Sequence, residues 1–415
     1  MLSERITRIR RGLREEHLVI GAVVISTFFI GFGGGVIFPI LPNLGEVIGI
    51  SPFLVGLILS ANRFSRLFAN APAGALVDRY GTRSPMIIGM FIQAVATTGY
   101  VIAVLAPFPE AWFLAARIFW GLGSALVFAT AFTIAADVSR HTSRGASMGL
   151  VRGGVLFGFP SGVVLGGIVS ELAGTLAAFG LATVFAFIAC LVAVLVIPET
   201  HVSGEARRSV SPLDINTSLP ALTVGLVNFA VLFVYIGALF ASLVLFLDVR
   251  DLSVFGLGPQ GSSGIFMAVT VISAGLFMFA SGYASDRRGS RVPLLLSFLA
   301  VLCFGFVLLT LSHSLTTLTL ACILIGAGQG GVSGPLMALL ADLTPGEQMG
   351  RAVGTNNVFG DVGGGLGPVV TLPIIDVVGF WPVYLACALL PALAAAILLG
   401  GVFRETGKFL PRVEM

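Results

Sequence analysis

Five ionisable side chains stand inside stretches of sequence that are otherwise apolar. They are four arginines and one aspartate: Arg63, Arg66, Arg117, Arg152 and Asp361. A charge at the centre of a lipid bilayer costs roughly 3 kcal/mol on insertion scales, so each of these residues is a candidate for a functional role. A buried aspartate can bind and release a proton, and an arginine beside it can serve as its counter-ion.

Two amides near Asp361 extend this candidate set. Asn356 and Asn357 precede Asp361 by about one helical turn, although an amide in a membrane helix more often joins two helices than contacts a ligand. Arg117 either couples transport to proton transfer or has only a structural role, in which it snorkels or bonds to backbone carbonyls. If Arg152 faces a cavity it favours an anionic substrate, whereas an Arg152 bonded to carbonyls indicates nothing about the substrate.

No arrangement of residues suited to catalysis is evident in the sequence. The four histidines are scattered near the predicted membrane edges, and the four cysteines fall inside apolar runs at no metal-ligand spacing. The sequence lacks a phosphate-binding loop of the G-x4-G-K-[ST] type, which argues against pumping driven by ATP. We therefore expect no enzyme, no metal, no cofactor and no nucleic-acid partner.

A polar turn occurs twice in the chain and carries a second set of candidates. The first copy runs from Gly74 to Pro85 and reads G-x-L-x-D-R-x-G-x-R. It recurs 208 residues later, from Gly282 to Pro293, with six of twelve positions identical. Chance would give roughly one match at ordinary residue frequencies. A turn duplicated about half a chain apart indicates a duplicated fold.

The elements that must position all these residues are membrane-spanning helices. The chain has 415 residues, of which 56% are hydrophobic and 10% charged, whereas a soluble domain carries about 25% charged residues. The sequence therefore predicts an all-α membrane protein. A spanning helix needs about 20 apolar residues, and twelve runs qualify: 18–41, 53–77, 85–106, 111–136, 145–169, 174–197, 218–247, 261–283, 292–311, 315–340, 351–375 and 379–403.

The distribution of charge predicts how the chain lies across the membrane. Eighteen of the 23 Lys and Arg residues fall on the side that holds both termini, and one, Arg250, falls on the other. Because positive charge is retained inside, both termini are predicted to be cytoplasmic, in the plasma (inner) membrane. The predicted order is a basic tail, a six-helix bundle, a cytoplasmic linker, a second bundle and a tail: 1–17, 18–197, 198–217, 218–403 and 404–415.

These features resemble the major facilitator superfamily over nearly the whole chain. The doubled turn is similar to the family's signature between helices 2 and 3, except that Thr82 and Ser290 replace a basic residue. The resemblance implies two pseudo-symmetric six-helix bundles that rock around a midplane cavity. It also implies a latch in each half, whose candidates are Gly74, Asp78, Arg79, Gly81, Arg83 and Asp137, then Gly282, Asp286, Arg287, Gly289, Arg291 and Asp342. The alternative is that the arginines only set the topology.

Three further patterns resemble the drug:proton antiporter branch of that family and favour export. Trp120 departs from the glutamine usual in the second pattern, and Phe159 interrupts the usual Gly-Pro pair in the third. The patterns are Gly33-x5-Pro39-x2-Pro42 in helix 1, Arg117-x3-Gly121-x-Gly123 in helix 4, and Gly154-x3-Gly158-x-Pro160-x-Gly162 in helix 5.

In the family fold helices 2 and 11 meet, which suggests a partner for Asp361. Arg63 and Asp361 each lie about 15 Å inside their helices, counting 1.5 Å per residue. We therefore expect an ion pair that protonation of Asp361 makes or breaks. Arg66, one turn away, is the competing partner, and a permanent structural ion pair is the alternative interpretation.

Together, the residues and the resemblance predict a secondary active transporter that acts as a monomer in the lipid bilayer. It would export small amphipathic or hydrophobic compounds, driven by inward flow of protons. One alternative is a symporter or uniporter for an organic anion or another metabolite. An alternative of another class is a membrane sensor or scaffold that does not transport.

Overall fold

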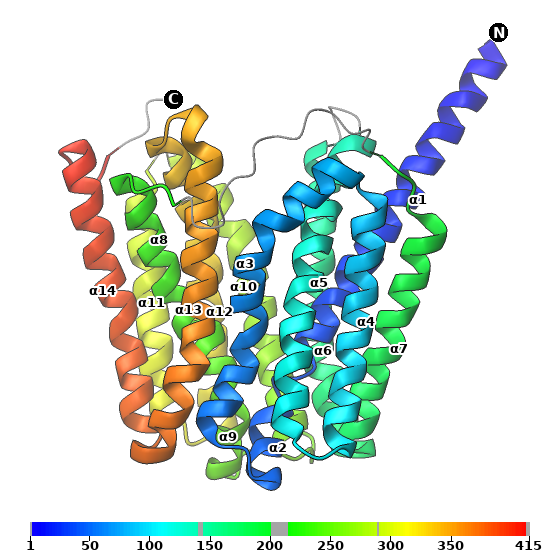
Figure 1. Ribbon diagram of the computed structural model, residues 1–415. Coiled ribbons are helices and arrows are strands. Elements are labelled where there is room, and N and C mark those ends of the chain that lie inside the picture. The colour runs from blue at the N-terminus through cyan, green and yellow to red at the C-terminus, as the bar shows by residue number, and fades with distance from the viewer. Residues whose placement is uncertain (1, 140–143, 201–214, 289, 412–415) are drawn as a thin grey trace. The chain divides into compact units, whose positions relative to one another are not determined.

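The structure is a computed structural model that describes residues 2–139, 144–200, 215–288 and 290–411. Helices make up almost all of this part of the chain (Figure 1). The one β-type pairing within it is an isolated bridge between Val254 and Leu257. The predicted all-α class is confirmed.

Helices of the first half follow the predicted spans closely, except that α1 already begins at Leu2 and that the chain differs near the first proline pair. α1 ends at Gly35 instead of residue 41, and a turn separates it from α2. Pro39 lacks the N–H that a continuing helix needs and disfavours helical geometry at the residue before it, so the helix breaks there. The bounds are α1 (Leu2–Gly35), α2 (Leu41–Ile48), α3 (Pro52–Tyr80), α4 (Arg83–Leu105), α5 (Pro109–Val138), α6 (Arg144–Ala173) and α7 (Thr175–Val196).

Helices of the second half include one change of winding. The segment η1 is a π-helix, and with α8 and α9 it forms a single candidate span from Leu219 to Arg250. The bounds are α8 (Leu219–Leu232), η1 (Phe233–Phe240), α9 (Ala241–Arg250), α10 (Pro259–Arg288), α11 (Val292–Thr310), α12 (Leu315–Leu343), the 3-10 turn η2 (Gly346–Gln348), α13 (Met349–Val378) and α14 (Phe380–Thr406).

Eleven helices in the described part of the chain are long and apolar enough to cross a membrane. The twelfth predicted span corresponds to α3, whose 29 residues exceed the roughly 20 that a crossing needs. Polar side chains in the middle of α3, from Asn62, Arg63 and Arg66, lower its mean hydropathy. The helix whose composition is not apolar enough is thus the one that carries two of the five ionisable candidates, Arg63 and Arg66.

Two compact units make up the chain, and each draws on separate stretches of sequence. The predicted division into 18–197 and 218–403 stays a prediction, and residues 201–214 of the linker lie outside the described residues. The first unit contains Met1–Ile37, Ser65–Gly162 and Ala173–Pro212, and the second contains Phe38–Phe64, Val163–Leu172 and Leu213–Met415.

Helix packing within each unit brings sequence-distant segments together. In the first unit α4 and α1 each pack on α5 and α7. In the second unit α10 and α11 pack on α12, and α8 packs on α13 and α14. Small residues permit this closeness: a side-chain carbon at Gly89 of α4 would lie 2.9 Å from the carbonyl oxygen of Gly123 in α5. Membrane helices use such contacts because lipid supplies no hydrophobic force between them.

Candidate functional site

Arg63 and Asp361 form an ion pair within the second unit. Arg63 Nη1 lies 3.3 Å from Asp361 Oδ1, and the two side chains are 15% and 12% exposed. Arg63 stands eleven residues after the start of α3, which is about 16 Å along the helix at 1.5 Å per residue. The pair therefore lies well inside both helices, as the sequence predicts, and little solvent reaches it.

Glycines of α13 make room for the pair. A side-chain carbon at Gly364 would lie 3.1 Å from Arg63 Nη1, so the guanidinium rests directly on the α13 backbone. One residue further, Gly365 provides the same closeness to the ring of Phe64, at 2.9 Å. Toward the start of α3, Gly56 abuts the backbone of Pro368 with no space for a side chain. The two helices thus run antiparallel along a seam of glycines that ends at Arg63 and Asp361.

The two amides predicted to accompany Asp361 lie in different surroundings. Asn356 is buried, its backbone oxygen accepts a 3.0 Å hydrogen bond from Asn228 Nδ2, and its own Nδ2 lies 3.3 Å from Met337 Sδ. Asn357 is exposed. The hydrogen bond from Asn228 joins α8 to α13 less than two turns from Asp361. Asn356 therefore takes part in a contact between helices, whereas the side chain of Asn357 is accessible.

The remaining arginines of the candidate set lie in the first unit. Arg117 is 1% exposed, with its guanidinium 5.7 Å from the centre of the Trp120 ring, so it does not snorkel. Trp120, which replaces the family's usual glutamine, supplies this aromatic face. Arg66 lies over the Phe128 ring at 5.7 Å. Arg152 on α6 is exposed.

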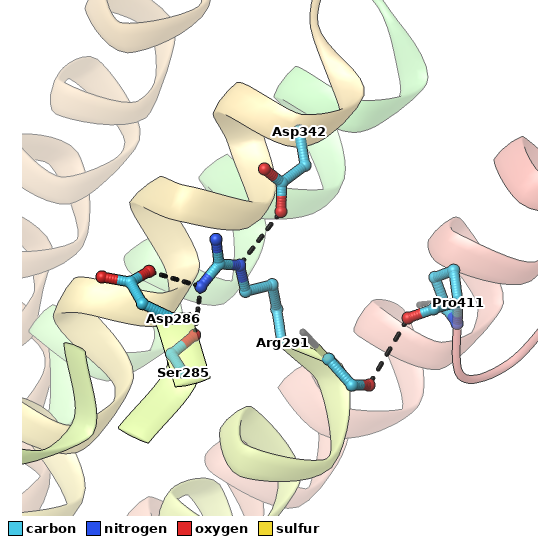
Figure 2. Close-up of polar contacts among 6 residues, drawn as sticks. Ser285, Asp286, Arg291, Asp342 and Pro411 are labelled. Atoms are coloured by element: carbon cyan, nitrogen blue, oxygen red, sulfur yellow. Dashed lines mark hydrogen bonds and ion pairs between the residues drawn. The ribbon is translucent and has the colours of Figure 1, made fainter. Parts of the chain in front are cut away.

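The turn of the second half contains a compact cluster of charges (Figure 2). Arg291 donates to Asp286 Oδ1 at 2.7 Å, to Asp342 Oδ2 at 3.0 Å and to Ser285 Oγ at 2.9 Å. Burial alone would lower the pKa of the Arg291 guanidinium, but hydrogen bonds to Asp286 and Asp342 outweigh it and raise the pKa. One arginine thus joins α10, α11 and α12. Gly289 of the same motif lies outside the described residues, and Gly282 borders open space.

The turn of the first half is built differently. Glu199, just after α7, accepts hydrogen bonds from the backbone N–H of Thr82 at 2.7 Å and of Arg83 at 3.2 Å, and from Thr82 Oγ1 at 3.0 Å. Arg83 itself donates to the carbonyl of Val194 instead of pairing with Asp78. Gly81, with φ of +81°, adopts a backbone conformation that favours glycine.

Glu199 was not predicted to belong to the site, although the sequence offers a signal for it. An acid directly after a spanning helix can reach a neighbouring turn, and free N–H groups at a helix start favour an anion. Thr200, the next residue, donates to Asp137 Oδ2 at 3.3 Å. The start of the linker, rather than Arg83, therefore connects the α3–α4 turn with the end of α5.

The first arginine of each motif copy lies outside these clusters. Arg79 lies over the ring of Tyr80 at 5.2 Å, and Arg287 lies over the ring of Tyr283 at 4.5 Å. Both arginines are exposed. Gly74, also of the first copy, borders open space. In the second half the structure thus separates Asp286 and Arg291 from Arg287.

The long apolar helices define a multi-pass membrane protein, in which α3 and α13 are joined by an ion pair. The sequence pattern of the Major Facilitator Superfamily matches residues 23–368 and 307–408, and the chain belongs to that family. It is therefore a transporter and not an enzyme, as predicted.

Two curated relatives are similar to the chain over different lengths. Multidrug resistance protein 2 of Bacillus subtilis is 23% identical over 364 residues, which cover 86% of this chain and 88% of that protein. Inner membrane transport protein YajR of Escherichia coli is 33% identical over 135 residues, which cover 31% and 29% of the two chains.

Solved transporter structures share the fold. A bacterial homologue of the human lysosomal transporter Spinster, inward-facing and occupied, superposes with a TM-score of 0.77 at 17% identity, over 94% of this chain and 97% of that one. The human organic anion transporter MFSD10 superposes with a TM-score of 0.64 at 21% identity, over 92% and 99%. The predicted fold class is confirmed.

Proposed function

We propose that this transporter is a proton-coupled exporter of small amphipathic or hydrophobic compounds. The observation that carries the proposal is the Arg63–Asp361 pair, which sets a carboxylate able to bind a proton beside its counter-ion, between two membrane helices. The similar B. subtilis protein carries the name Multidrug resistance protein 2, which agrees with export of such compounds.

Protonation of Asp361 would release Arg63. A proton bound to the carboxylate makes it neutral, whereas the guanidinium stays charged because arginine is not deprotonated in proteins. Arg63 Nη1 lies 3.3 Å from Asp361 Oδ1, which is longer than the about 2.7–2.9 Å of a strong charge-assisted hydrogen bond. A contact of that length is weaker than a strong charge-assisted hydrogen bond, as a cycle of proton binding and release requires.

The same proposal gives the loop clusters and the termini their roles. Arg291, held by Asp286 and Asp342, is the latch of the second half, and Asp78, Arg83 and Asp137 belong to the corresponding turn of the first half.

The excess of arginine on one side supports cytoplasmic termini. The similar E. coli protein is named an inner membrane transport protein, which supports a plasma-membrane location. The working form is a monomer.

Proton-coupled export is tested with purified protein in proteoliposomes. A pH gradient is imposed, and the efflux of fluorescent lipophilic dyes and the movement of protons are followed together. We expect Asp361→Asn to abolish both signals, and Asp361→Glu to retain part of them. Asp376→Asn, an exposed position on the same helix, is the matched control and should behave as wild type. Dye efflux by Asp361→Asn at the wild-type rate and pH dependence would remove Asp361 from the mechanism.

A second candidate function is uptake or exchange of an organic anion. Its support is the exposed guanidinium of Arg152, which can attract an anion, and the fold shared with a human organic anion transporter. In the same vesicles, a substrate gradient imposed without a pH gradient separates the two candidates. Anion uptake that depends on Arg152 but not on Asp361 would favour this second function.

A further inference from the structure

Arg79 and Arg287, both predicted as latch residues, share a setting apart from the charge cluster around Arg291. Each stands in the last turn of a spanning helix, exposed, with its guanidinium over the ring of an exposed tyrosine. Neither lies within ion-pair distance of a carboxylate in the described part of the chain. An arginine held flat on an aromatic ring keeps the N–H groups at its edge available for an oxyanion.

The two arginine–tyrosine pairs arise from different sequence positions. Tyr80 follows Arg79 directly, whereas Tyr283 precedes Arg287 by four residues, one helical turn. Under the repeat of 208 residues, Tyr283 corresponds to Ala75 and Tyr80 corresponds to Arg288. The pairing is therefore not a by-product of the duplicated motif, because each half supplies its tyrosine separately. Tyr80 and Tyr283 are also the two exposed tyrosines among the five of the chain.

An exposed apolar stripe leads to each pair along one helix face. On α10 the stripe reaches Arg287 at helical spacing, and on α3 a similar stripe reaches Arg79. In a membrane protein such a face meets acyl chains, since it would be unfavourable against water. The stripes consist of Ile272, Leu276, Phe279 and Tyr283 on α10, and of Phe68, Pro72 and Leu76 on α3.

The position of the arginines along their helices matches the level of lipid headgroups. The 30 residues of α10 extend about 45 Å at 1.5 Å per residue, which exceeds the roughly 30 Å hydrocarbon core and reaches into the headgroup region. Tyrosine is enriched at that level because its ring is apolar and its hydroxyl is polar. On α10 the apolar stripe, tyrosine and arginine thus follow the order of acyl chain, interface and phosphate, and on α3 Arg79 and Tyr80 stand together at the end of the stripe.

We propose that Arg79 with Tyr80, and Arg287 with Tyr283, are two binding sites for the headgroup of an anionic phospholipid. The guanidinium edge donates to the phosphate diester, and the acyl chains lie along the exposed stripe of the same helix. The neighbouring Asp286 is engaged by Arg291 at 2.7 Å, which weakens its repulsion of a phosphate. The proposal stands whether or not the transporter is coupled to protons.

Native mass spectrometry of the full chain in detergent, titrated with phosphatidylglycerol or phosphatidylcholine, tests the two sites. We expect two tightly retained phosphatidylglycerol molecules on the wild type, lower occupancy of one site in Arg79→Gln or Arg287→Gln, and lower occupancy of both sites in the double variant. Each substitution should weaken binding about fivefold, the size expected for one arginine at an anionic membrane surface. Phosphatidylcholine binding should not change.

Matched variants separate a headgroup site from simple positive charge. Arg250→Gln is the control, because Arg250 also lies over a ring, that of Phe246 at 5.5 Å, but on the side of the membrane predicted to be external, and it is bonded to His313. It should keep both lipids. Arg79→Lys and Arg287→Lys preserve charge and guard against misfolding, and they should bind less tightly than the wild type. Wild-type lipid retention by the double variant would overturn the proposal, as would displacement by millimolar inorganic phosphate.

Discussion

The carboxylate of Glu199 accepts a 2.7 Å hydrogen bond from the backbone N–H of Thr82. It accepts a second backbone bond from Arg83, the first residue of α4. Since the first N–H groups of a helix have no partner within it, Glu199 acts as an N-cap supplied from 117 residues away in the chain. The turn between α3 and α4 is thereby fixed to the start of the central linker.

Replacing Glu199 with alanine should lower the thermal stability of the protein. The expected loss is about 1 kcal/mol, the usual effect of removing an N-cap. The measurement is the melting temperature of the purified protein in detergent. Glu405→Ala, at an exposed position near the end of α14, is the control and should leave the melting temperature unchanged. Equal melting of both variants would show that the cap contributes nothing.

Two glycines of the same motif should respond oppositely to alanine. Gly81 has φ of +81°, and its added carbon would overlap the Glu199 carboxyl, so Gly81→Ala should destabilise by roughly 1–2 kcal/mol. Gly74 lies inside α3 and borders open space, so Gly74→Ala should be neutral or stabilise by up to about 1 kcal/mol. Thermal melts of the pair in one detergent give the comparison. Similar losses at both positions would contradict it.

Asp342 should matter more than Asp286 in the cluster around Arg291. The side chain of Asp342 is 23% exposed and that of Asp286 is 75% exposed, and exposed ion pairs contribute at most about 1 kcal/mol. Asp342→Asn should therefore lower the melting temperature more than Asp286→Asn. A double-mutant cycle with Arg291→Lys measures each coupling, because lysine lacks the planar fork that serves two acids. A larger coupling for Asp286 would refute this order.

Space at Gly364 should be needed for transport. Its added carbon would approach Arg63 Nη1 to 3.1 Å, so in Gly364→Ala the guanidinium must shift from Asp361. We expect a several-fold lower transport rate with unchanged expression. Gly354→Ala, on the same helix but bordered by open space, is the matched control. Proteoliposome flux measures both variants, and equal flux would mean that Arg63 tolerates the shift.

Glu46 should make the protein less stable as the pH rises. Burial, and then the charges of Asp248 and Asp376, raise the pKa of the Glu46 carboxyl above its ordinary value. A carboxyl with a raised folded-state pKa adds stability below its unfolded pKa, about 4.3, and this contribution is lost as pH increases through the folded-state pKa. Glu46→Gln should therefore raise the melting temperature at pH 7 but not at pH 4. Glu110→Gln serves as control, and a gain confined to pH 4 would contradict the sign.

Much of the helix order could be read from the sequence, because apolar runs of spanning length leave few alternatives. The pairing of Arg63 with Asp361 was also within reach, since both charges stand at similar depth in their helices. The role of Glu199 could not be predicted from the sequence, because a contact that caps a turn depends on the three-dimensional position of a loop residue. The stacking of Arg79 and Arg287 on tyrosines was missed for a related reason: the motif groups them with the aspartates, while the helix end directs them outward.

The π-helical segment Phe233–Phe240 winds more widely than the helices on either side of it. Each residue of such a segment advances less around the axis than an α-helical residue does. A count of 3.6 residues per turn, carried from Leu219–Leu232 through the π-helix, therefore predicts the wrong faces for the residues of Ala241–Arg250. Ser242, whose Oγ lies 2.8 Å from the hydroxyl of Tyr384, is a reference point beyond the offset. Cysteine-scanning positions numbered on a helical wheel from Leu219 would be assigned to the wrong side after Phe240.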